Sequence, residues 1–251
     1  MSTAILNDIT KCVNCKACSL ACSEQNGLPR EPGKELSAHH FTVIQPAGGY
    51  NVKRQCMHCV DPACASVCPV GALQKSPEGP VVYDESKCIG CRYCMLGCPF
   101  DIPKYEWHST KPFVKKCEMC RDTRLAQGKQ PACTAACPTG ATVFGERDEL
   151  IREAYRRIDE HPDRYHKHVY GVTEVGGTSV LYLSPVPFEA LGFRTQVKHE
   201  SYPQMTWNVL SKVPMLAGTV GVGLAGLFWA IQRREDVAEF EKREKDEGGH
   251  H

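Results

Sequence analysis

Residues 88–100 read CIGCRYCMLGCPF, with cysteines at positions 88, 91, 94 and 98 and a proline at position 99. Three thiolates spaced two residues apart on a curled loop can converge on three corners of an iron–sulfur cubane. Proline suits the first turn of a helix, so Cys98 is expected to start a helix that points away from this loop. The fourth thiolate would then reach a different cluster, as in two-cluster ferredoxins. The stretch therefore predicts two neighbouring centres rather than one.

Three further groups of cysteines resemble this one. The 251 residues contain 16 cysteines, and the other groups are Cys12, Cys15, Cys18 and Cys22; Cys56, Cys59, Cys64 and Cys68; and Cys117, Cys120, Cys133 and Cys137. Cys68 and Cys137 also precede a proline, whereas Cys22 precedes Ser23, which weakens the helix-start argument there. With four thiolates for each cluster, the 16 cysteines predict four [4Fe–4S] clusters and leave none over.

Other uses of these cysteines are less favoured. Cysteines two residues apart on a tight loop pair poorly as disulfides. Zinc is an alternative mainly for the group from Cys117 to Cys137, because zinc ribbons use C-x2-C pairs separated by a longer spacer. A [3Fe–4S] centre is a further alternative, although no cysteine is replaced to indicate one. Lys plus Arg total 30 and Asp plus Glu 29, a balance that gives no reason to expect a nucleic-acid partner.

Spacing alone leaves two pairings of the groups open. Cys68 and Cys88 are close in sequence, so the second and third groups can form an inner module around which the first and last groups pair. Alternatively, the first group pairs with the second in tandem.

Four longer stretches carry a family resemblance: QCMHCVDPACASVCPVGAL, CIGCRYCMLGCPFDIPKY, KCEMCRDTRLAQGKQPACTAACPTGA and VYGVTEVGGTSVLYLS. They resemble the four-cluster ferredoxin-type electron-transfer (beta) subunits of membrane-bound molybdenum enzymes and type-2 nickel–iron hydrogenases. The likeness is strongest to the formate dehydrogenase-N beta subunit and the hydrogenase iron–sulfur subunit. The cysteine motifs cover residues 8–145, and the loop after the first group is shorter than in that family.

The resemblance implies that the outer groups pair, which gives four ligand sets. They are cluster 1 on Cys12, Cys15, Cys18 and Cys137; cluster 2 on Cys56, Cys59, Cys64 and Cys98; cluster 3 on Cys68, Cys88, Cys91 and Cys94; and cluster 4 on Cys22, Cys117, Cys120 and Cys133. By analogy, cluster 4 would lie nearer the membrane partner.

The expected fold is α+β, with two intertwined bacterial-ferredoxin-like modules and one C-terminal transmembrane helix. The expected divisions are an outer module (1–45 and 106–146), an inner module (46–105), a helix and strand extension (147–204), a transmembrane anchor (205–232) and a charged tail (233–251).

Two regular elements are predicted beyond the cysteines. Residues 147–160 place Leu150, Ala154 and Ile158, with Ile151 and Tyr155 beside them, on one helical face, and Asp148 is a candidate cap. Residues 180–184 alternate as in a strand that Pro185 ends.

A membrane segment is predicted at residues 213–231, which carry no charge. At about 1.5 Å per residue it is about 28 Å long, close to the thickness of a hydrocarbon core. Ala217, Gly221 and Ala225 form a face suited to packing on another membrane helix. A buried helix of a soluble protein is the alternative. Residues 235–251 are charged and are expected to be frayed or disordered.

No substrate site is apparent, so the chain is expected to be a non-catalytic subunit. The resemblance implies electron transfer between a large catalytic subunit, either a hydrogenase or a molybdenum or tungsten formate dehydrogenase, and a membrane cytochrome b or quinone-reactive subunit. The alternatives are a subunit of a terminal molybdenum reductase and a free polyferredoxin. His58 is expected to line a cluster or donate near it. Lys53, Arg92, Lys104, Lys115 and Lys116 would raise cluster potentials or contact partners, with solvated surface charge as the alternative.

The expected location is the membrane, with lipid around the C-terminal helix. No N-terminal export signal is visible, so the chain is cytoplasmic or is exported with a signal-bearing partner. Arg233 and Arg234 after the apolar segment favour a cytoplasmic C-terminus and hence a periplasmic iron–sulfur domain. The cytoplasmic face stays open as the alternative.

Overall fold

The computed structural model describes residues 2–110 and 112–247. The chain divides into two compact units, with the boundary between Pro203 and Gln204. The first unit is a mixed α/β domain of short elements, and the second is helical. Residues 248–251, the end of the predicted charged tail, lie outside the described residues.

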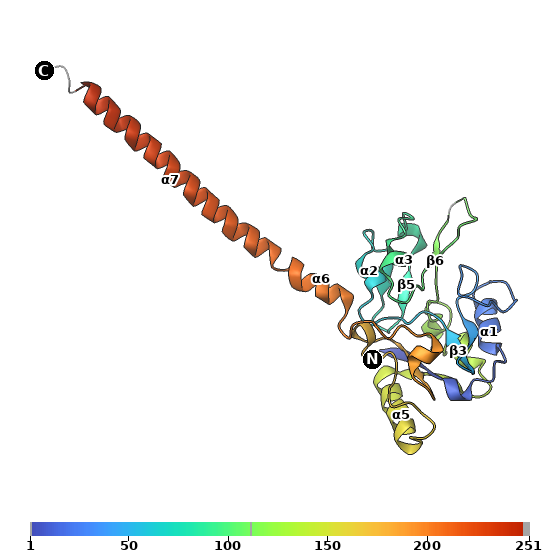
Figure 1. The fold of residues 1–251 in the computed structure, drawn as a ribbon. Coiled ribbons are helices and arrows are strands. Elements are labelled where there is room, and N and C mark those ends of the chain that lie inside the picture. The colour runs from blue at the N-terminus through green and yellow to red at the C-terminus, as the bar shows by residue number, and fades with distance from the viewer. Residues whose placement is uncertain (1, 111, 248–251) are drawn as a thin grey trace. The chain divides into compact units, whose positions relative to one another are not determined.

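A three-stranded sheet joins the two ends of the first unit (Figure 1). Its strand order is β8-β1-β9, with β1 at Thr3–Asp8, β8 at Thr142–Glu146 and β9 at Val180–Leu183. The central strand β1 pairs antiparallel with β8 and parallel with β9. Side chains along β1 alternate between two buried hydrophobic cores. Ile5 belongs to one core, and Ala4 and Leu6 belong to the other. Strand β9 confirms the predicted strand.

Helix α5, Arg147–Glu160, matches the predicted helix and packs on this sheet (yellow in Figure 1). Leu150, Ala154 and Ile158 are buried against it, while Tyr155 is 42% exposed. The predicted cap at Asp148 is wrong, because Glu146 occupies the N-cap and its carboxylate accepts a hydrogen bond from the Glu149 N–H. Strand β8 ends at Glu146, so the cap falls where strand becomes helix.

Three two-stranded hairpins and several short helices complete the first unit. The hairpins are β2–β3 (Val43–Ala47 and Tyr50–Arg54), β4–β5 (Leu73–Lys75 and Val81–Tyr83) and β6–β7 (Lys104–Tyr105 and Val114–Lys115). The cysteine-bearing helices are α1 (Ala17–Gln25), α2 (Ala63–Ser66), α3 (Tyr93–Gly97) and α4 (Ala132–Ala135). The 3-10 turns are η1 (Ile9–Lys11), η2 (Glu85–Lys87), η3 (Leu125–Gln127), η4 (Glu174–Gly176) and η5 (Phe188–Leu191).

The C-terminal unit consists of the end of α6 (Tyr202–Leu210) and the long helix α7 (Val213–Glu247). Residues 202–245 include an apolar window of mean hydropathy 1.6, none of it buried, so by length and composition this stretch can cross a membrane. The expectation of a frayed tail is wrong for residues 235–247, which continue α7. Glu, Lys and Arg are good helix formers, and Arg243 pairs with Glu239 one turn earlier at 3.9 Å.

A buried ion pair fixes α5 to the start of the first cysteine loop. The carboxylate of Asp8 is 1% exposed and accepts hydrogen bonds from Arg157 Nη1 at 3.1 Å and Tyr165 Oη at 2.9 Å. Asp8 also caps η1, the turn that leads to Cys12. The helix is therefore coupled through one carboxylate to the position of a predicted ligand.

We predict that Arg157→Ala lowers the free energy of unfolding by about 3 kcal/mol, since it removes the closer of the two cations beside a buried carboxylate and leaves only Lys11, at 3.9 Å. Arg156 is the matched control, because its side chain is 55% exposed and pairs with Glu153 and Glu160 on the surface. Arg156→Ala should cost less than about 1 kcal/mol. Anaerobic urea unfolding of both variants measures the difference, and equal losses would contradict the assigned role of Arg157.

Candidate metal centres

Each cysteine group begins with a loop that has the same backbone turn. The residue just before the second cysteine has a positive φ in all four groups: 58° at Asn14, 48° at His58, 71° at Gly90 and 56° at Met119. This left-handed turn curls the chain so that the two flanking cysteines can face one centre. It also turns backbone N–H groups toward sulfur, at 3.3 Å from Met119 N to Cys117 Sγ and 3.4 Å from Gly90 N to Cys88 Sγ.

Each helix begins one residue before the third cysteine of its group, and this corrects one expectation. Cys98 does not start a helix; it is the C-cap of α3, and Cys68 and Cys137 likewise follow α2 and α4. The proline after each of them begins a turn, since it has no N–H with which to continue a helix. Cys22, followed by Ser23, lies inside α1, which runs on to Gln25.

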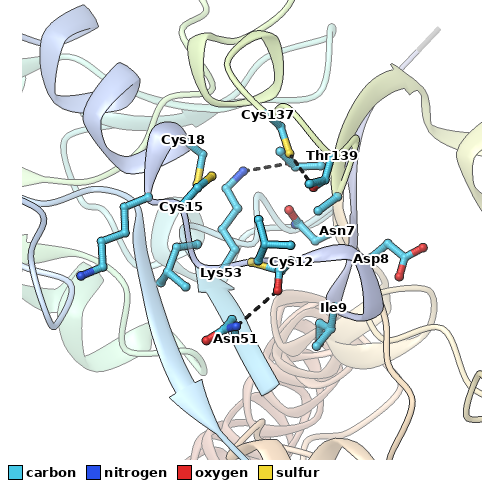
Figure 2. Close-up of a pocket in the computed structure, with 15 residues that line it drawn as sticks. Asn7, Asp8, Ile9, Cys12, Cys15, Cys18, Asn51, Lys53, Cys137 and Thr139 are labelled. Atoms are coloured by element: carbon cyan, nitrogen blue, oxygen red, sulfur yellow. Dashed lines mark hydrogen bonds between the residues drawn. The ribbon is translucent and has the colours of Figure 1, made fainter. Parts of the chain in front are cut away.

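One cavity gathers cysteines from both ends of the motif region (Figure 2). It is lined by Cys12, Cys15 and Cys18 from the first group and by Cys137 from the last. Residues 7 and 142, on the neighbouring strands β1 and β8, also line it, together with Lys53 of β3. The Asn51 amide donates to the Cys12 carbonyl at 3.2 Å, and the Cys137 sulfur lies 3.7 Å from Thr139 Oγ1.

A second cavity lies one helical turn further along α1. It is lined by Cys22 together with Cys117, Cys120 and Cys133. Burial and, after it, the neighbouring Cys133 thiolate together raise the pKa of the Cys22 thiol to about 12, although the Thr42 side chain opposes them. Cys18 and Cys22 are one helical turn apart, yet they line different cavities.

The remaining eight cysteines also fall into two sets. Burial raises the pKa of Cys59 well above its usual value, and the neighbouring thiolates that add to this are Cys56, Cys98 and Cys64. Burial raises the pKa of Cys94 to about 11, with added contributions from Cys88, Cys91 and Cys68. Both sets draw on the two groups that are adjacent in sequence, with the fourth cysteine of each group beside the other group's set.

The donor arrangement fits a cluster better than a single ion. Within residues 2–110 and 112–247, no three His, Cys, Asp or Glu side chains lie close enough together to hold one metal ion. A cubane differs, because each of its four irons takes one thiolate and the sulfurs therefore stand further apart. Asn7, which lines the first cavity, has a buried side-chain amide without a hydrogen-bond partner, and the sulfurs of a cluster are acceptors for it.

The four sets follow one another through shared packing. Cys18 and Cys133 belong to one buried cluster of side chains, Cys56 and Cys117 to a second, and Cys64 and Cys94 to a third. Cys15 and Cys91 are exposed, whereas Cys56 and Cys117 are buried.

Several residues around the cavities were not distinguishable by sequence. Lys53 and Lys116 are only 5% and 4% exposed, so they are not solvated charges, whereas Arg92 is exposed and stacks on Trp107 at 5.1 Å. His58 is buried, and its Nδ1 accepts the Val81 N–H at 2.9 Å, which leaves the proton on Nε2. Burial lowers the pKa of His58 well below its usual value, so the ring is neutral. Asn7 and Thr42 carried no sequence signal, since both lie outside the cysteine groups.

Comparison with known proteins agrees with this chemistry. The 4Fe-4S dicluster domain family matches residues 49–147. The protein is thus a ferredoxin-type iron–sulfur protein.

Three relatives define the family further. The hydrogenase-2 operon protein HybA of Escherichia coli O157:H7 is 39% identical over 76% of the present sequence and 72% of its own length. The nitrate-inducible formate dehydrogenase iron-sulfur subunit of E. coli K12 is 38% identical over 72% of the present sequence and 67% of its own. The B subunit of the anaerobic dimethyl sulfoxide reductase of E. coli K12 is 41% identical over 58% and 74%, respectively. The protein belongs to this family of iron–sulfur beta subunits.

We predict that Cys22→Ser perturbs the same centre as Cys133→Ser and a different one from Cys15→Ser, because Cys22 shares a cavity with Cys133. Electron paramagnetic resonance (EPR) spectra of the three reduced variants, each with its iron content, make the comparison. If Cys22→Ser and Cys15→Ser altered the same signal, the first cysteine group would hold one centre by itself.

Proposed function

We propose that the protein relays electrons through four [4Fe–4S] clusters between a catalytic subunit and a membrane subunit. The observation that carries the proposal is that eight of the 16 cysteines line two cavities, four around each, and that each cavity draws on both the first and the last cysteine group. The proposed ligand sets are Cys12, Cys15, Cys18 and Cys137; Cys56, Cys59, Cys64 and Cys98; Cys68, Cys88, Cys91 and Cys94; and Cys22, Cys117, Cys120 and Cys133. We number these clusters 1 to 4 in that order.

Each cluster, when bound, supplies a site that takes up and returns a single electron. The protein binds it through thiolates and places backbone N–H groups at sulfur, as Ala72 N does to Cys68 Sγ at 3.2 Å. These N–H groups lower the pKa of Cys68 although burial opposes them, and so favour the thiolate that binds iron. The buried packing around Cys56 and Cys117 keeps water from the middle of the series.

The proposed order of the clusters is 1, 4, 2, 3. It is supported by the packing of Cys18 with Cys133, Cys117 with Cys56, and Cys64 with Cys94. This order differs from the expectation that cluster 4 lies nearer the membrane partner, because the ligands of cluster 4 are mostly buried between two other sets. Clusters 1 and 3, which include the exposed Cys15 and Cys91, form the two ends.

The end at cluster 3 is proposed to face the membrane subunit. Four large apolar side chains are exposed around it and form what we call the α3 patch: Ile89 (65%), Tyr93 (56%), Leu96 (85%) and Trp107 (62%). The first unit ends beside the inner module, since Ser201 Oγ donates to the Asp61 carboxylate at 2.6 Å just before α2, which carries Cys64, a proposed ligand of the neighbouring cluster 2. Cluster 1 would then face the catalytic subunit.

The proposed modules interleave as the resemblance implies, with one change of boundary. Residues 1–45 and 106–146 form the outer module and residues 46–105 the inner one, but Asn51 and Lys53 of the β2–β3 hairpin line the cluster 1 cavity. The hairpin therefore belongs with the outer module. No residue is assigned a catalytic role. The proposed partners are a hydrogenase or formate dehydrogenase catalytic subunit, a cytochrome b or quinone-reactive subunit, and the lipid around α7.

A terminal reductase is the second candidate, favoured by the 41% identity to the B subunit of dimethyl sulfoxide reductase. The relay would be the same and the electrons would run in the opposite direction. In either case we propose that the iron–sulfur domain is periplasmic, on the support of Arg233 and Arg234 after the apolar part of α7.

We predict that the full-length protein, purified from detergent-solubilised membranes, carries about sixteen irons, four for each cluster. It should co-purify with a large oxidoreductase subunit and a membrane subunit, and the identity of the large subunit decides between formate, hydrogen and a reductase substrate. Recovery of an isolated soluble protein, or iron content well below this value, would contradict the proposal.

The control for this experiment is a variant lacking residues 205–251. It should keep its iron and lose its membrane association, because α7 is the candidate span. Unchanged membrane association and quinone-linked activity in the truncated variant would favour a free polyferredoxin.

We predict that Leu96→Glu slows electron transfer to the membrane subunit about tenfold or more, because a charge in an apolar contact must be desolvated on docking. Val13→Glu is the matched control at the other end, where Val13 is 62% exposed beside cluster 1. The measurement is the rate of quinone-linked oxidation or reduction, with iron content and transfer to a soluble dye checked in each variant. An equal defect in both variants would argue against the α3 patch as the membrane-facing surface.

A further inference from the structure

Lys53 is a buried cation that reaches into the cluster 1 cavity without a carboxylate partner (Figure 2). The residue is 5% exposed, and its ammonium donates to Thr142 Oγ1 at 3.1 Å. Among the described residues no ion pair joins it to an Asp or Glu. Asp8 also lines the cavity, but its carboxylate is engaged by Arg157 and Tyr165. A buried charge needs compensation, and the available groups here are thiolates.

Those thiolates come from two different clusters. Lys53 lines the cavity together with Cys18, a proposed ligand of cluster 1, and Cys18 packs in the same buried cluster of side chains as Cys133, a proposed ligand of cluster 4. The side chain is therefore a fixed positive charge between the first two centres of the proposed relay.

Two other lysines with internal partners, the half-buried Lys75 and the buried Lys116, differ from Lys53. Lys75 donates to the backbone carbonyls of His58 at 3.3 Å and Cys59 at 2.8 Å, and Lys116 donates to those of Val81 and Cys117. Carbonyl oxygens thus satisfy their charges before any cluster is bound. Lys53 has one hydroxyl as its oxygen acceptor among the described residues, which leaves its remaining N–H groups for sulfur.

We propose that Lys53 raises the reduction potentials of clusters 1 and 4 together, a proposal that rests on the four-cluster relay above. A cubane held by four thiolates is an anion and becomes more negative when it takes an electron, so a nearby cation favours the reduced form. Because the same ammonium faces both clusters, its contribution largely cancels when an electron passes from one to the other. It makes both centres easier to reduce without creating an energy step between them.

The test is an EPR-monitored redox titration of the full-length protein in its detergent-solubilised complex. Lys53→Met removes the charge and keeps an apolar side chain of similar length. We expect reduction of clusters 1 and 4 to become about tenfold or more less favourable, which for one electron corresponds to a potential about 59 mV or more lower. Clusters 2 and 3 should keep their potentials, and the gap between clusters 1 and 4 should change less than either potential.

Two variants separate charge from packing. Lys53→Arg keeps the charge and should retain potentials close to those of the parent protein, whereas Lys53→Gln keeps a hydrogen-bond donor and should behave like Lys53→Met. If Lys53→Met fails to assemble its clusters, the comparison of Arg with Gln still decides the question. Lys16→Asn is the matched control, because Lys16 lines the same cavity but is exposed, and its loss should shift the potentials less.

The outcomes also separate this proposal from the function on which it depends. If neither the EPR spectra nor the iron content of the parent protein gives four clusters, the four-cluster relay is wrong. If it has them, and Lys53→Gln leaves clusters 1 and 4 unchanged or shifts only one of them, the shared role of Lys53 is wrong. If Lys53→Arg and Lys53→Gln lowered the potentials of clusters 1 and 4 equally, the effect would come from packing, and the proposal would also be overturned.

Discussion

The structure depends on a strained backbone turn that cysteine loops must adopt to aim neighbouring thiolates at one centre. Eight described non-glycine residues have a positive φ, and six of them lie in these loops: Asn14, Lys16, His58, Arg92, Met119 and Cys120. The left-handed conformation costs an ordinary residue about 1–2 kcal/mol. Binding of a metal by thiolates couples a large free energy to the folded conformation and can offset this cost. Folding of the cysteine loops and insertion of the clusters are therefore best understood as one process.

The need to aim thiolates at one centre also explains why the fold brings the first and last cysteine groups together. Cys12 and Cys137 line one cavity, although nearly the whole motif region separates them in sequence. Their approach follows from the antiparallel pairing of β1 with β8, since Asn7 lies opposite Thr142 just outside the two cysteine loops. Strand β9 completes this sheet and helix α5 packs on it. The Asp8–Arg157 pair then fixes the helix to the turn before Cys12. Strands and a helix that contain no cysteine thus fix the relative positions of the loops that carry Cys12 and Cys137.

Sequence predicted what depends on local pattern and missed what depends on burial. The cysteine groups, the range of α5 and strand β9 follow from spacing and periodicity, and the family resemblance was confirmed. The role of the prolines was misjudged, because a Cys-Pro pair is compatible with the start or the end of a helix. Lys53 and Arg92 are equivalent as sequence, yet one is buried by the β2–β3 hairpin and the other is exposed on Trp107. No local signal carries that difference, since it arises when distant segments pack together.

The proposed relay has opposite requirements at its middle and at its ends, and the distribution of side chains is consistent with both. The middle must exclude water, and Cys56 and Cys117 are buried there with Ile102. The ends must come close to a partner, and Cys15 and Cys91 are exposed there beside Val13 and Ile89, which have open apolar surfaces. A lysine acts more strongly on a nearby cluster from the interior than from the surface, because water and salt screen an exposed charge much more than a buried one. The position of Lys53 between two interior-facing cysteine sets is therefore one where a single side chain can act on two centres at once.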